Sequence, residues 1–243
     1  IKRKACVRDV RKWGRVAVDA EVDHLRVNDT YKAVENLISL RLAEAGKTRQ
    51  KDQPWAATFR FAIPDRFPDM TGRLRVADIG SPNFSAGNLE LAWDLKDIAR
   101  ELKTVSGHFQ TGFGPGSMRN ITELQKSHAL VNVLLVPYVE LHKIRQKSRG
   151  SLENAVPTGL DFTRMFGDFS AGAGVVGVNF IHFDSRPFQA YTAGTADFPK
   201  EKVDLNVIMR MTETAQNLPY SMVDDEGRLA LDVSLVDDLN KPE

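Results

Sequence analysis

The sequence predicts an α+β fold that is mainly antiparallel β, a sandwich or barrel-like sheet with two or three helices packed on one face or end. Many short segments alternate apolar and polar residues, as half-buried strands do. These segments cluster in two groups and do not alternate regularly with helices. Two other segments carry apolar residues three and four positions apart, the spacing of one helix face. The chain has 243 residues, and we predict a single domain, 1–243.

The predicted sheet is built from residues 10–27, 57–79 and 128–236. The most apolar run, Ala129 to Val139, is rich in valine and has no polar face, so we expect a central strand covered on both sides. Ser151 to Gly167 contains proline and glycine and reads as irregular. Apolar and polar residues alternate in residues 58–63, 178–183, 202–212 and 228–236, and residues 73–79 read as a further strand.

Two helices are predicted, at Asn28 to Gly46 and at Asn88 to Lys103. In each, apolar residues form one stripe, a capping residue precedes it and a glycine lies at or beyond the end. A third, short helix through Lys126 can be capped by Ser117 or Asn120. We expect these helices to cover the sheet.

Charge is distributed unevenly along the chain, although its net value is only +1. Residues 1–15 contain seven basic residues and one acid, whereas residues 220–243 contain seven acids and two bases. Oppositely charged ends can attract within one chain or between copies; the second arrangement would build rings or filaments. A solvated or intramolecular arrangement is the simpler alternative.

Two basic segments are candidate nucleic-acid-binding sites, because Lys and Arg release counterions when they neutralise phosphates. One is the N-terminal segment and the other follows the predicted central strand, where cations occur at every second position. A solvated basic surface would give the same pattern. The candidate residues are Lys2, Arg3, Lys4, Arg8, Arg11, Lys12, Arg15, Lys143, Arg145, Lys147 and Arg149.

Two glycine-rich stretches are alternative phosphate-binding candidates. In the first, Gly112, Gly114, Gly116 and Arg119 precede a predicted helix, whose free amides can hold an anion. Pro115 removes one amide, and no Gly-Lys-Ser/Thr follows, so this is not a P-loop. The second, residues 172–177, matches G-x-G-x-x-G but lacks the preceding strand and following helix of a dinucleotide site. Close backbone approach or a bent strand explains it better.

The remaining composition limits the function classes. Cys6 is the only cysteine, so the chain forms no internal disulfide and no cysteine-based zinc site, which fits a reducing compartment, the cytoplasm or a virion. The apolar run is too short to cross a bilayer. We find no signal peptide, and because the sequence starts with Ile1 we expect a trimmed or processed chain.

We assign no catalytic residue, metal or cofactor, and we lean towards a protein that is not an enzyme. The predicted function is that of a structural assembly protein, a coat-, matrix- or nucleocapsid-type subunit. Such a subunit would associate with copies of itself and contact RNA or single-stranded DNA. The alternative is an enzyme or ligand-binding domain that holds a phosphate-bearing ligand at residues 112–119 or 172–177.

Overall fold

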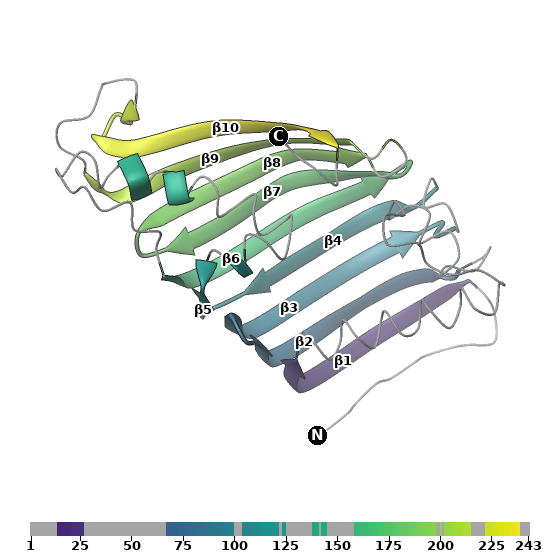
Figure 1. Ribbon diagram of the computed structural model, residues 1–243. Helices are drawn as coiled ribbons and strands as arrows, with labels where there is room; N and C mark the ends of the chain where they lie inside the picture. The colour runs from purple at the N-terminus through teal and green to yellow at the C-terminus, as the bar shows by residue number, and fades with distance from the viewer. Residues whose placement is uncertain are drawn as a thin grey trace.

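The described strands form one ten-stranded sheet, shown as a broad curved surface in Figure 1. The strand order is β1-β2-β3-β4-β6-β7-β8-β9-β10, and β5 pairs with β3 and β6. This computed structural model describes residues 14–26, 67–99, 104–121, 123–124, 138–140, 142–144, 158–197, 200, 202–214 and 222–238. The strands are β1 (Arg15–Arg26), β2 (Asp69–Ser81), β3 (Phe84–Lys96), β4 (Ser106–Phe113), β5 (Gly116–Arg119), β6 (Gly159–Gly172), β7 (Val175–Ser185), β8 (Phe188–Asp197), β9 (Lys202–Thr214) and β10 (Arg228–Asp238).

All neighbouring strands pair antiparallel except β1 and β2, which are parallel. Antiparallel neighbours need only short connections, and most of the sheet is a succession of hairpins. The turn between β6 and β7 consists of Ala173 and Gly174, both with positive φ (53° and 80°). Two such residues are the pattern of a tight hairpin turn.

The sheet has one apolar face, which we call the inward face, and one polar face, the outward face. On β9 the alternation is complete: every second residue is at most 8 % exposed, namely Val203, Leu205, Val207, Met209 and Met211. Their neighbours, among them Asp204 and Arg210, belong to the outward face. The predicted strands 202–212 and 228–236 are therefore confirmed, as are those at 73–79 and 178–183.

The inward face carries two clusters of buried residues at different positions along the strands. The smaller one contains Val178, Val203 and Leu205. The larger one joins sheet residues to residues outside the strands, and the ring of Tyr138 packs 4.7 Å from that of Phe188. The members that lie outside the strands are Ile121, Leu124, Tyr138 and Val139.

An irregularity crosses the middle of the sheet from β3 to β6. Asn88 has a φ of 53°, Gly114 has a φ of 131°, and the peptide between Gly114 and Pro115 is cis. Gly87 donates a backbone hydrogen bond to Pro115 (2.9 Å), and Gly114 donates one to Gly87 (2.8 Å). On β6 the register shifts between Phe162 and Arg164. Such bulges bend strands and redirect side chains.

The predicted helix at Asn88 to Lys103 is wrong, because residues up to Lys96 belong to strand β3. Leu91 and Leu95 are four residues apart, and residues so spaced share a face in a strand as well as in a helix. The position of Trp93 shows that the segment is a strand. Trp93 pairs with Gly72 on β2, and its indole lies so close that a Cβ on that glycine would be 2.6 Å away. Pairing with β2 and β4 therefore overrides the helical spacing.

Other predictions also need correction. Residues 138–140 and 142–144 are helical, so the central strand expected through this region is wrong there, and the rest of Ala129 to Val139 lies outside the described residues. Helical residues follow Asn120, as expected. The predicted helix at Asn28 to Gly46 and the predicted strand at 58–63 lie outside the described residues. The stretch read as irregular contains β6 from Gly159 onward. In the described part of the chain the fold is therefore a single large mixed sheet with little helix.

Candidate functional site

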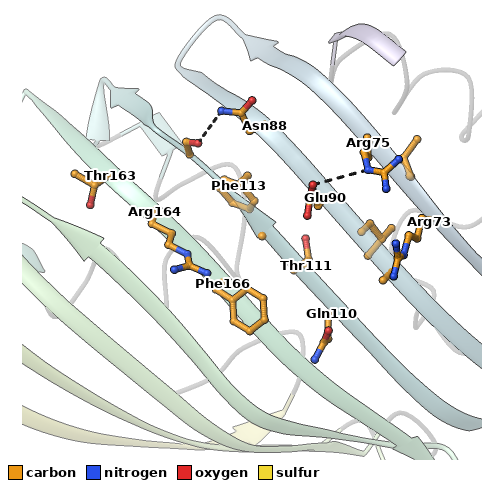
Figure 2. Close-up of a pocket in the computed structure, with 15 residues that line it drawn as sticks. Arg73, Arg75, Asn88, Glu90, Gln110, Thr111, Phe113, Thr163, Arg164 and Phe166 are labelled. Carbon is orange, nitrogen blue, oxygen red and sulfur yellow. Dashed lines mark hydrogen bonds and ion pairs between the residues drawn. The ribbon is translucent and has the colours of Figure 1, made fainter. Parts of the chain in front are cut away.

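The outward face carries a hollow of about 570 Å³ that spans β2, β3, β4 and β6 (Figure 2). It lies beside the irregularity, since Asn88, Gly114 and Thr163 belong to both. The lining residues are Arg73, Leu74, Arg75, Asn88, Glu90, Leu91, Ala92, Gln110, Thr111, Gly112, Phe113, Gly114, Thr163, Arg164 and Phe166.

The hollow exists because two small residues stand among long ones. In one row across the sheet, Ala92 lies between Arg73 and Gln110. In the next row, Gly112 lies between Glu90 and Phe166. Since side chains of one face stand side by side at neighbouring strands, a missing side chain leaves a depression with the long side chains as its walls.

Three arginines and one glutamate line the hollow, so its formal charge is positive. Arg75 is engaged by two carboxylates: its guanidinium lies 3.2 Å from Glu21 and 3.9 Å from Glu90. Arg73 and Arg164 are exposed, and neither forms an ion pair with any residue that the structure describes. These two cations are therefore available to an anion from solution.

Phe166 forms the wall at the β6 side. Its ring leans over Gly112, since a Cβ on that glycine would lie 3.2 Å from Cδ2 of the ring. The guanidinium carbon of Arg164 lies 5.5 Å from the ring centroid, within the range of a cation–π contact. Figure 2 shows the broad face of this ring turned towards the viewer, above the strands. Phe180, 5.6 Å away and 40 % exposed, continues the aromatic surface beyond the hollow.

A hydrogen-bond network adjoins the hollow and shares Gln110 with it. Asp168 accepts hydrogen bonds from Gln110 (2.7 Å), His108 (3.0 Å) and Asn179 (2.6 Å). These bonds, those from Asn179 and Gln110 above all, hold the pKa of Asp168 below its usual value of 3.8. Asp168 is thus kept as an anion, and Gln110 is fixed at the edge of the hollow.

Most of the predicted nucleic-acid-binding residues lie outside the described residues: Lys2, Arg3, Lys4, Arg8, Arg11, Lys12, Arg145, Lys147 and Arg149. Two are described, and each forms an ion pair with a carboxylate. Arg15 pairs with Asp94 at 3.0 Å, and Lys143 pairs with Glu140 at 2.7 Å. Lys143 is helical. The prediction that it belongs to a strand with cations along one side is therefore wrong for this residue.

The glycine stretch at 112–119 takes part in the sheet, since Gly112 is in β4 and Gly116 and Arg119 are in β5. The amide of Gly114 donates a hydrogen bond to the carbonyl of Gly87, and Arg119 forms an ion pair with Asp161 at 2.8 Å. The expected cradle of free amides at a helix start is therefore absent from this stretch, although Gly112 and Gly114 do line the hollow. Residues 172–177 span the β6–β7 hairpin, with no helix following the glycines.

Sequence reasoning missed the residues that give the hollow its charge. Arg73 and Arg75 alternate with Leu74 and Val76 in a strand that was predicted, so their common face was accessible from the sequence. Arg164 and Phe166 lay in the stretch read as irregular, and no local signal connects them to β2.

No family model matches this chain, and no curated protein or solved structure is significantly similar to it. In the described part of the chain, no group of three or more His, Cys, Asp or Glu side chains is arranged to hold a metal ion. A helix with the length and apolarity needed to cross a bilayer is likewise not found among the described residues.

Proposed function

We propose that this protein is a ligand-binding protein whose outward face holds a small phosphate-bearing molecule in the arginine-lined hollow. The observation that carries the proposal is the position of Arg73 and Arg164. They stand at opposite sides of one depression, and in the described residues neither is neutralised by a carboxylate. Guanidinium groups bind phosphate oxygens through paired, charge-assisted hydrogen bonds.

The size and composition of the hollow support the same proposal. Small-molecule sites are usually clefts of about 300–1,000 Å³ with a few polar groups that fix orientation, and a hollow of about 570 Å³ is within that range. Overall, however, the outward face is not basic. Asp19, Asp204 and Asp232 are among several exposed acids on it. This distribution favours one small anion at a local positive site over a long phosphate backbone lying across the face.

The test is titration calorimetry of the whole chain with inorganic phosphate and pyrophosphate at low ionic strength. We expect Arg73→Gln to weaken binding about tenfold, because it removes a charged hydrogen-bond donor to the phosphate, and Arg164→Gln to weaken it less, through the loss of one positive charge at the hollow. Arg210→Gln is the matched control: Arg210 is an exposed arginine of the outward face on β9, away from the hollow. Equal losses in all three variants, or no binding by the parent chain, would refute the proposal.

As a second function, we propose self-association with nucleic-acid contact, which the charge pattern predicts. One observation favours its first half: in the described part of the sheet, β1 and β10 each have a single neighbouring strand. Free sheet edges are templates for pairing with another chain. Light scattering at low and moderate salt tests self-association, and a monomer at both would exclude it. Salt-sensitive binding to RNA or single-stranded DNA tests the nucleic-acid half.

A further inference from the structure

We propose that the ligand of the arginine-lined hollow is a nucleotide, lying across the strands with its ring on Phe166, its sugar over β4 and β3, and its phosphate at β2. This inference rests on the proposed function, because it names the ligand that the hollow takes. Three kinds of side chain follow one another across the hollow in that order.

The ring end is defined by Phe166. One side of its ring covers Gly112, and Figure 2 shows the broad face of the ring turned towards the viewer. Arg164 stands beside it, with the guanidinium carbon 5.5 Å from the centroid. Because Arg164 is exposed, rotation of its side chain can admit a planar ring, which would then contact the phenyl face and the guanidinium. Stacking of this kind is how proteins hold bases without reading their sequence.

The centre of the hollow suits a sugar. Glu90 is exposed there, and a carboxylate repels phosphate but accepts hydrogen bonds from hydroxyl groups, as acidic residues do with ribose in dinucleotide sites. Gln110, held by its bond to Asp168, stands at the edge of the same region. The small residues Ala92 and Gly112 leave room above the strands for a sugar ring.

The phosphate end is defined by Arg73 and Arg75 on β2. Three strand spacings separate β2 from β6, about 14 Å at about 4.8 Å each, and arginine side chains reach inward over part of that distance. Arg75 is shared with Glu21 and Glu90, whereas Arg73 is exposed and has no ion pair among the described residues. Arg73 is therefore the residue expected to contact the phosphate directly.

The experiment compares four probes on the whole chain by titration calorimetry: adenosine 5′-monophosphate, uridine 5′-monophosphate, ribose 5-phosphate and inorganic phosphate. We expect both nucleotides to bind at least tenfold more tightly than ribose 5-phosphate, since stacking adds to the phosphate contact. Phe166→Leu should remove most of that advantage and leave ribose 5-phosphate binding unchanged. Tyr191→Leu, which replaces an exposed aromatic of β8 outside the hollow, is the matched control and should change neither. Melting curves of each variant verify folding.

The outcomes separate this inference from the function on which it rests. Equal affinity for nucleotides and ribose 5-phosphate, with both weakened by Arg73→Gln, would overturn the nucleotide while the anion site stands. Failure of all four probes to bind would overturn both. A preference for nucleotides that survives Phe166→Leu would overturn the assignment of the ring to Phe166. Weaker nucleotide binding by Glu90→Gln, with inorganic phosphate unaffected or improved, would support the position of the sugar.

Discussion

Phe166 on β6 lies directly over Gly112 on β4: a Cβ on the glycine would come within 3.2 Å of Cδ2 of the ring. The two residues are paired in register, so the aromatic ring covers the backbone that the glycine leaves bare. The same absence of a side chain creates the depression beside the ring. One contact thus accounts for both a wall and part of the floor of the arginine-lined hollow.

The other small floor residue, Ala92, gives the sharpest test of the hollow. We expect Ala92→Leu to reduce phosphate and nucleotide binding at least tenfold, because the larger side chain fills the space between Arg73 and Gln110. Ala193→Leu, on the outward face of β8, is the matched substitution outside the hollow and should leave binding unchanged. Titration calorimetry measures both. Strong binding by Ala92→Leu would show that the ligand lies elsewhere.

Asp168 should contribute to stability at neutral pH but not in acid. Its folded-state pKa is lowered by the bonds from Asn179, Gln110 and His108, so its contribution is complete above the unfolded pKa and is lost as the pH falls through the folded value. We expect Asp168→Asn to lower the free energy of unfolding by about 1 kcal/mol at pH 7. The difference from the parent chain should shrink below a pH of about 3.8.

Denaturant unfolding at several pH values measures this effect. Asp204→Asn, an exposed outward carboxylate on β9, should change the free energy of unfolding at pH 7 by less than about 0.5 kcal/mol. A difference for Asp168→Asn that stays constant from pH 7 to pH 3 would contradict the role given to the network.

Ala173 should be a site of stabilisation. It occupies the first central position of the β6–β7 turn with a φ of 53°, a left-handed conformation that disfavours alanine and suits asparagine. Ala173→Asn creates Asn-Gly with Gly174, the favoured pair for this turn, and we expect a gain of about 0.5–1 kcal/mol. Thermal melting measures it against Ala193→Asn, which lies within a strand and should give no gain. A lower melting temperature for Ala173→Asn would contradict the turn geometry.

Met209 and Arg210 test the assignment of the two faces. Met209 is fully buried, and Met209→Ala should cost about 2–5 kcal/mol through lost contacts and a cavity. Arg210, the next residue, is exposed, and Arg210→Ala should change stability by less than about 0.5 kcal/mol. Equal effects in denaturant unfolding would mean that β9 does not separate an apolar from a polar face.

Alternation along single strands made parts of the fold predictable. Every second residue from Val203 to Met211 could be assigned to one face, because apolar residues recur there at a period of two. Leu91 and Leu95 could not be assigned in this way, since a spacing of four satisfies a helix as well as a strand. The start of β6 was not predicted for a different reason: glycines interrupt its pattern, so the stretch reads as irregular.

By itself, the sequence determined which segments of β2, β7, β9 and β10 are strands and, in β9 and β10, which side chains turn inward, because a period of two is local information. It also placed Arg73 and Arg75 on one face of β2. Tertiary structure alone decided the rest of the hollow: the register of β3, β4 and β6 brings Phe166 and Arg164 opposite residues far away in the chain. Register depends on pairing between strands, and no single segment encodes it.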